Sequence, residues 1–219
     1  MNYQSTIYRF LLIFIIGFFS ACESDDEAID DALDQNNPSQ TDFTDLLQNQ
    51  IDHIIIPAMD DYQSKMADLK LASESFKNMP DAQNFTELRQ KFETAYLSYQ
   101  AAAVHNYFAT QNQGLISTTN LFPIDTSALE SFIDNGNYNF STAAQQRANG
   151  FPALDYLLYG NTDPLALFVS DSNRLVFLDE MLTFMNDKSI DLANSWKGNL
   201  RSNFIANGGT QLGSSISVQ

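Results

Sequence analysis

Apolar residues recur at steps of three and four along two long stretches of the chain, and this spacing constrains the fold most. Such spacing places side chains on one face of an α-helix. In the first stretch the face comprises Phe43, Leu47, Ile51, Ile54, Ala58, Tyr62, Met66, Leu69, Ala72 and Phe76. In the second it comprises Phe85, Leu88, Phe92, Ala95, Tyr99, Ala102 and Asn106. The sequence therefore predicts two long amphipathic helices.

Helix-breaking and helix-capping residues set the expected limits of these two helices. Pro57 lies inside the first run, where it should kink or split the helix, because proline removes a hydrogen bond and clashes with the preceding turn. The segment "NMPDAQN" predicts a turn between the two helices. Asn84, with Glu87 three residues later, has the form of an N-cap pair for the second helix.

A third long helix is expected to start at Ser170 and Asp171 and to end at "NGG". Its apolar face comprises Leu175, Leu178, Leu182, Met185, Leu192, Trp196, Leu200 and Phe204. The stretch from residue 111 to 139 lacks a long period and contains glycine and proline, so it should be loop with at most short helices. Stretches in which apolar and polar residues alternate over the length of a β-strand are scarce. The fold class predicted is an all-α helical bundle with a long irregular connection.

The N-terminal segment indicates export. Arg9 precedes an apolar run from Phe10 to Phe19, which is too short to span a bilayer as a helix and is followed by small residues. Cys22, the only cysteine of the chain, follows Ser20 and Ala21 and resembles the lipidated cysteine of bacterial lipoproteins. We therefore interpret residues 1–21 as a lipoprotein signal peptide. The alternative is an ordinary signal peptide cleaved near Ala21, with Cys22 left as a free thiol.

Residues 22–42 are rich in acids, amides and serine, so we expect a flexible acidic tether. The acidic run resembles the surface-export signals of Bacteroidetes lipoproteins, and a plain solvated spacer is the alternative. The formal net charge of −16 argues against nucleic acid as a partner, because nucleic-acid binding depends on Lys and Arg. It also disfavours electrostatic docking to anionic lipid. The membrane contact expected is the N-terminal lipid, on an outer-membrane lipoprotein of the cell envelope facing the periplasm or the surface.

Five segments occur in an order that resembles the imelysin family, helical proteins of bacterial envelopes that include a metallopeptidase and iron-regulated proteins. They are "IIIPAMDDY", "LRQKFETAYLSYQ", "LFPID", "GFPALDYLLYG" and the helix that contains Trp196. The resemblance implies that residues 43–219 correspond to the first half of the family's domain, in which two helical bundle halves pack side by side. The chain stops at "GGTQLGSSISVQ", where the family would begin further helices. We therefore expect a fragment or a shortened member.

The family's signature is a glycine, any residue, a histidine, two residues and a glutamate. Here Gly150 stands at the glycine position, Pro152 at the histidine position and Asp155 at the glutamate position. A proline side chain has no lone pair with which to bind a metal, but its fixed φ suits the first turn of a helix. We therefore expect Pro152 to start a helix and to supply no chemistry.

Asp155 is the only charge between Phe151 and Tyr159, on a short helix that is apolar all round, so we expect it to be buried. A buried carboxylate needs a partner or hydrogen bonds. In a structural interpretation it lies near the helix N-terminus or pairs with Arg147. In a functional interpretation it keeps the acidic corner of the family's site together with Asp125 of "FPID". We favour the structural interpretation.

Other candidate ligands are few. His53 falls opposite the first apolar face, and His105 lies at the edge of the second, so neither is expected to bind a metal. Asp60 and Asp61 could serve a hard cation, but adjacent acids on a helix turn are usually solvated. The sequence contains no His-Glu-x-x-His cluster and no Ser-His-Asp or Cys-His set. The aromatic residues expected in the core rather than around a ligand are Phe92, Tyr96, Tyr99 and Trp196.

The resemblance implies a non-catalytic, lipid-anchored binding module that serves iron or haem acquisition, with Asp155 and Asp125 as remnants of the site. Iron, haem or another divalent metal is the ligand class that it implies, and iron or haem transport components of the envelope are the implied partners. The first alternative is an imelysin-type metallopeptidase whose remaining ligands come from the missing half. A structural or adhesive bundle without a ligand is the second.

Overall fold

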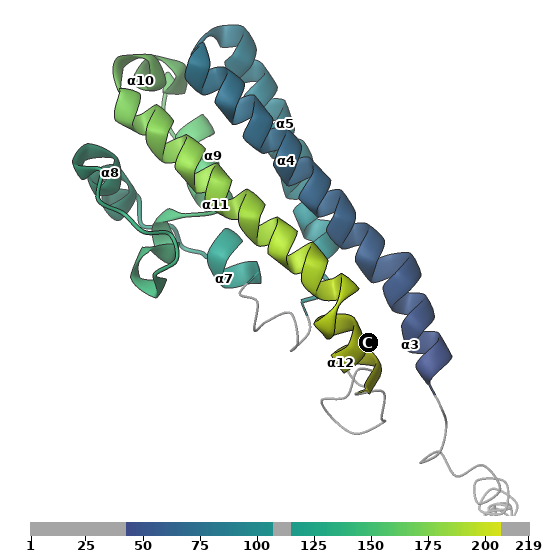
Figure 1. Cartoon of the computed structure of the whole chain (residues 1–219). Coiled ribbons are helices and arrows are strands. Elements are labelled where there is room, and N and C mark those ends of the chain that lie inside the picture. The colour runs from purple at the N-terminus through teal and green to yellow at the C-terminus, as the bar shows by residue number, and fades with distance from the viewer. Residues whose placement is uncertain (1–42, 107–114, 207–219) are drawn as a thin grey trace, which may run out of the picture. The chain divides into compact units, whose positions relative to one another are not determined.

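Three long helices form the centre of the fold and correspond to the three predicted from apolar spacing. The computed structural model describes residues 43–106 and 115–206. Helix α4 (Ile56–Asn78) packs against both α5 (Ala82–Ala103) and α11 (Ser172–Lys197), as Figure 1 shows. In these two described ranges all regular elements are helices and no strand occurs. The predicted all-α class is confirmed.

The apolar faces of these helices meet in one core. Its largest fully buried side chains include Tyr62 and Phe76 from α4, Tyr99 from α5, and Phe177 and Trp196 from α11. The residues predicted for the face of α5 that are buried are Phe85, Leu88, Phe92, Ala95, Tyr99 and Ala102. Full burial of one large apolar side chain stabilises the fold by roughly 1.5–3 kcal/mol. The core is therefore the main source of stability.

The first helix continues through a π-helical turn just before Pro57. Helix α3 (Thr44–Gln50) leads into the π-helix η2 (Ile51–Ile55), and Pro57 lies in the first turn of α4. The wider π turn shifts the apolar face by one residue. Ile55 is fully buried, whereas Ile54, which was predicted to be buried, is 53 % exposed.

Met59 likewise takes the buried position predicted for Ala58. The predictions for Ile54 and Ala58 were wrong, because they assumed one constant helical period.

The N-cap of helix α5 lies three residues before the predicted cap. The side chain of Asp81 accepts a hydrogen bond from the backbone N–H of Asn84 at 2.9 Å, so Asp81 is the N-cap. The Asn84 side chain instead donates to the carbonyl of Met79 at 2.8 Å. The predicted cap pair of Asn84 and Glu87 is wrong, because an aspartate directly after the turn caps the helix first.

The connection between α5 and α11 contains only short helices in its described part, as predicted. They are α7 (Leu115–Thr119), α8 (Thr126–Asn135), the 3-10 helix η3 (Ala143–Ala148), α9 (Phe151–Tyr159) and α10 (Pro164–Ser170). α9 packs against α5, α8 and α10, whereas α7 and α8 contact α11.

Helix α11 begins as predicted and ends earlier. Asp171 caps it by accepting a hydrogen bond from the N–H of Asn173 at 2.9 Å. Gly198 separates α11 from α12 (Asn199–Ala206), so the single helix predicted through Phe204 is two helices. Phe204 still reaches the core, with its ring centroid 5.7 Å from that of Trp196.

Several predictions fall on residues that the structure does not describe. They are the signal peptide over residues 1–21, the tether over residues 22–42 with Cys22, and the "NGG" that should end the last helix. Among the helices of residues 43–106 and 115–206, none combines the length and the apolar character needed to cross a membrane.

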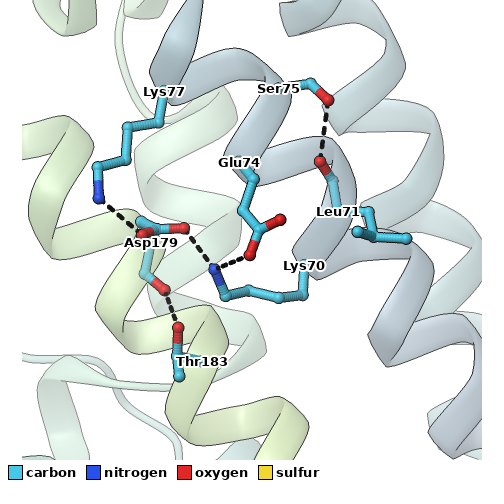
Figure 2. A network of polar contacts seen from close by, with 7 residues as sticks. All are labelled: Lys70, Leu71, Glu74, Ser75, Lys77, Asp179 and Thr183. Carbon is cyan, nitrogen blue, oxygen red and sulfur yellow. Dashed lines mark hydrogen bonds and ion pairs between the residues drawn. The ribbon is translucent and has the colours of Figure 1, made fainter.

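A polar network joins α4 to α11 on the edge of the core (Figure 2). Both carboxylate oxygens of Asp179 bind lysines of α4: Oδ1 lies 2.6 Å from Lys70 Nζ, and Oδ2 lies 2.8 Å from Lys77 Nζ. Lys70 also contacts Glu74 at 2.9 Å. The side chains of Asp179 and Lys70 are only 13 % and 14 % exposed, so this pair is shielded from solvent.

The pKa values of the pair shift so that both groups stay charged. Burial raises the pKa of Asp179, but the hydrogen bonds from Lys70 and Lys77 outweigh it, and the pKa lies below the usual value. Burial lowers the pKa of Lys70, but the bonds to Asp179 and Glu74 leave it above its usual value. Because the pKa of Asp179 is depressed in the folded state, its stabilisation is present above about pH 4 and is lost as the pH falls through the folded value.

We predict that Asp179→Asn lowers the unfolding free energy of the purified full chain by about 1–3 kcal/mol at pH 7, because Lys77 loses its counter-charge and Lys70 keeps only Glu74. The difference from wild type should shrink as the pH falls below about 4, where the unfolded wild-type chain binds a proton, and vanish once the folded carboxylate is also protonated. Urea titrations across this range measure both effects.

The matched control is Asp68→Asn, which breaks the exposed pair of Asp68 with Lys91 at 3.5 Å. It should cost at most about 1 kcal/mol. A cost for Asp179→Asn no larger than this, or one that does not change with pH, would contradict the importance of the buried network.

Candidate functional site

The segment "GFPALDYLLYG" forms α9, which begins where the chain passes very close to α7. Gly150 is the N-cap and has φ 90° and ψ −168°, a conformation that side chains rarely adopt. A Cβ atom there would lie 2.4 Å from the carbonyl oxygen of Thr119. Pro152 occupies the first turn of the helix and is buried, as a helix-starting proline should be. Glycine at position 150 is therefore a packing requirement.

Asp155 is exposed, so the prediction that it is buried was wrong. Helix α9 buries Phe151, Pro152, Ala153, Leu154, Leu157 and Leu158, while Asp155 and Tyr159, four residues apart, face outward. A helix that looks apolar all round thus still keeps one solvent-facing strip. Within the described residues, no ion pair or hydrogen bond of the Asp155 side chain occurs, and the proposed pairing with Arg147 is not formed.

Asp125 serves as a helix cap. Its Oδ1 accepts a hydrogen bond from the N–H of Ala128 at 2.9 Å at the start of α8. Its own N–H donates to the carbonyl of Arg147 at 2.8 Å, which fixes "FPID" to the segment before α9. The structure therefore places Asp125 close to the entrance of α9 in the fold but gives its carboxylate a capping role.

The C-terminal end of α9 is bound by Arg89 of α5. Its Nε donates to the carbonyl of Leu158 at 3.1 Å, and its Nη2 contacts the same oxygen. The guanidinium carbon lies 4.3 Å from the ring centroid of Phe85 and 4.5 Å from that of Tyr159. A cation at this end satisfies a free carbonyl and complements the helix dipole. The sequence analysis missed Arg89, whose only signal is a charge next to the apolar face of α5.

A second polar cluster ties the outward side of α9 to α8 and α11. The hydroxyl of Tyr156 donates to Glu130 Oε1 at 2.9 Å, and Arg174 forms an ion pair with the other oxygen of Glu130. Burial raises the pKa of Tyr156, and its hydrogen bond to Glu130 raises it further, so the hydroxyl remains a donor. These three residues come from three different helices and hold α9 in place.

Two buried tyrosines lie in the core near the entrance of α9. Tyr62 and Tyr99 pack edge to face with ring centroids 5.8 Å apart, and Phe151 contacts Tyr99 at 5.0 Å. Burial raises the pKa of both tyrosines, so neither is a proton carrier near neutral pH. The cavity between Tyr62 and Thr119 has a volume of about 10 Å³, which suits one water molecule and not an organic ligand.

The aromatic residues predicted to be core are Phe92, Tyr99 and Trp196, which are buried, and Tyr96, which is half-buried.

The two histidines lie in different parts of the fold. His53 is exposed on η2, as predicted, and His105 is buried after α5, where burial lowers its pKa. Asp60 lies 2.6 Å from Lys197, and Asp61 lies 3.8 Å from Lys65, so both acids face cationic side chains. In the described part of the chain, no group of three or more His, Cys, Asp or Glu residues could hold a metal ion.

Two of three comparisons with known proteins found a match. The family model described as Imelysin, peptidase family M75, matches residues 55–218. No curated protein matches the chain. Among solved structures, the crystal structure of an imelysin-like protein from Psychrobacter arcticum 273-4 is similar, with a TM-score of 0.62 and 13 % sequence identity.

That match covers 80 % of this chain and 56 % of the Psychrobacter protein, so the chain spans little more than half of the protein that it resembles. At this identity the match shows a shared fold only. The family model covers well over half of the sequence. The chain therefore belongs to the imelysin family.

Proposed function

We propose that this protein is a lipid-anchored, imelysin-like cell-envelope protein that binds a ligand without catalysis and takes part in iron or haem acquisition. The observation that carries the proposal is Pro152, which stands where the family's signature has a histidine. A proline at this position cannot bind a metal or move a proton. It can start α9, and the geometry around Gly150 and Pro152 fits that role.

The acids of the candidate site support the same conclusion. The carboxylate of Asp125 is used in capping α8, and Asp155 lies on the exposed strip of α9 and belongs to no group of three or more potential metal ligands in the described residues. A catalytic zinc usually takes three protein ligands, and loss of one ligand weakens a site far more than a shortened acid does. Packing of α9 is thus preserved in this chain, and its capacity for metal catalysis is not.

One observation favours a metallopeptidase with an altered signature as the second candidate. Asp155 is solvent-accessible, and no hydrogen bond or ion pair within residues 43–106 and 115–206 engages its side chain. It is therefore free to contact a metal or substrate held by residues of another segment.

We predict that ligand binding does not depend on Asp155. For the full chain with haem, ferrous, ferric or zinc ions at a hundredfold excess over Kd, binding should raise the melting temperature by about 5–10 °C. Asp155→Asn should show the same rise, because the acid points to solvent. With zinc, the wild type should hydrolyse no protein substrate above a blank without enzyme.

Three outcomes would contradict this proposal. The absence of any melting shift with all four probes would remove the iron or haem role. A melting shift that occurs in the wild type and is absent in Asp155→Asn would show that Asp155 belongs to the binding site. Chelator-sensitive cleavage that disappears in Asp155→Ala would establish the peptidase. The companion variant Pro152→His should gain no zinc-dependent cleavage, because position 152 is buried, Asp155 is exposed and Asp125 caps α8.

The anchor generates a separate prediction. Cys22→Ala should move the protein from the membrane fraction to the soluble fraction, because the lipid is the proposed membrane contact and the net charge of −16 disfavours anionic lipid. Fractionation after a high-salt wash measures the distribution. A Cys22→Ala protein that still sediments with membranes would show that the anchor lies elsewhere.

A further inference from the structure

A groove with aromatic walls lies away from α9, between the loop that follows α8 and the middle of α11. Its volume is about 430 Å³. The loop contributes Tyr138 and Phe140, and α11 contributes Glu180, Thr183, Phe184 and Asp187. None of the family's signature residues lines it.

The aromatic rings of the groove are held from behind. The ring centroids of Tyr138 and Phe140 are 5.0 Å apart, and that of Phe140 lies 5.9 Å from Phe184. Phe177, which is buried in the core, meets Tyr138 edge to face at 4.9 Å and Phe140 at 5.4 Å. Phe140 is itself only 7 % exposed, so the half-buried rings of Tyr138 and Phe184 form the accessible part of this supported surface.

The loop itself is fixed by local hydrogen bonds. The N–H of Ser141 donates to Asn139 Oδ1 at 3.0 Å, and the N–H of Thr142 donates to the Asn139 carbonyl at 3.1 Å. The N–H of Asn139 in turn donates to the side chain of Gln145. A groove that is already formed loses little entropy when it binds.

Two exposed carboxylates flank the aromatic surface. Glu180 and Asp187 are seven residues apart on α11, which is about 10.5 Å along the helix axis, and Phe184 lies between them. Burial raises the pKa of Tyr138, and its hydrogen bond to Glu180 raises it further. The tyrosine hydroxyl therefore stays protonated and donates to Glu180, which orients this acid.

Within the described part of the chain, neither acid has a cationic partner. No Lys or Arg of residues 43–106 or 115–206 forms an ion pair with Glu180 or Asp187. Lys188 is next to Asp187 in sequence, but its ammonium pairs with Asp191 at 3.8 Å and lies over the Phe184 ring, 5.7 Å from its centroid. It does not line the groove.

Rings beside carboxylates suit a guanidinium, which stacks on aromatic faces and binds acids through its planar N–H groups. The groove is open at the rim, where Glu180, Thr183 and Asp187 are exposed, so a small molecule would stay largely in water instead of being enclosed. An arginine side chain that is held in place by the backbone of a partner polypeptide does not need to be enclosed by the groove. The charge of −16 also favours encounter with a basic partner.

We propose that this groove binds arginine side chains presented by an extended, basic segment of a partner polypeptide. One arginine lies on the aromatic surface beside Glu180, and a second, three residues along the segment, reaches Asp187. In the polyproline II conformation, which has three residues per turn and rises about 3.1 Å per residue, side chains three residues apart face the same side about 9 Å apart, close to the separation of the two acids.

The test uses the full chain in non-ionic detergent and fluorescently labelled peptides of the form Gly-X-Ser-Gly-X-Gly. With X as arginine, fluorescence anisotropy should show binding at about 1 mM or below. Lysine should bind more weakly, and citrulline, the neutral isostere of arginine, at least about fivefold more weakly. A peptide with two adjacent arginines has equal charge but the wrong spacing, and should also bind more weakly.

Variants of the groove supply the second arm. Glu180→Gln with Asp187→Asn should weaken the arginine peptide about tenfold and leave the citrulline peptide unchanged. Phe184→Leu should weaken the arginine peptide while the protein melts within a few degrees of wild type. The control is Glu87→Gln with Asp45→Asn, which removes two exposed acids outside the groove and should leave affinity nearly unchanged.

Four results would overturn the proposal. They are no binding of the arginine peptide at about 1 mM, equal binding of the citrulline peptide, and equal weakening by the control pair of substitutions. The fourth is binding of free agmatine as tight as that of the arginine peptide, which would identify a small organic cation as the ligand.

Discussion

The apolar face of α4 packs against both α5 and α11, and this contact sets the position of the other elements. Burial of rings such as those of Tyr62 and Phe76 supplies the stability, since each large side chain contributes roughly 1.5–3 kcal/mol. Ion pairs at the edge then select the register between α4 and α11. The pair of Lys70 with Asp179 is shielded from solvent, and the exposed pair of Asp60 with Lys197 lies further along the same two helices.

Helix α9 is held to this core at both of its ends. At its start Gly150 allows the chain to pass against Thr119, and at its end Arg89 binds the last turn through the carbonyl of Leu158. Because these contacts use backbone atoms, they depend little on the residues at the signature's histidine and glutamate positions. A chain with Pro152 can therefore keep the helix while the metal-binding side chain is absent. The groove on the far part of the connection is independent of these contacts.

Sequence periodicity predicted the three long helices and the buried face of α5, because burial of one face repeats over many turns. It failed at Ile54, where a π turn shifts the buried face of the helix. The π turn is a change in backbone hydrogen bonding, and the pattern of side chains in the sequence does not indicate it. It also failed for Asp155, because burial of a nine-residue helix depends on its neighbours and not on its own composition. Arg89 acts across 69 positions of sequence, so no local pattern indicates its partner.

The unfolding free energies of three variants test most directly whether α9 is preserved for packing. Gly150→Ala should lose about 2–4 kcal/mol, because it combines a positive φ with a clash against Thr119. Gly136→Ala, also at positive φ but in open space, should lose only about 1–2 kcal/mol. Asp155→Asn should change stability by less than about 0.5 kcal/mol. Equal losses for the two glycine variants, or a large loss for Asp155→Asn, would contradict the packing role of this helix.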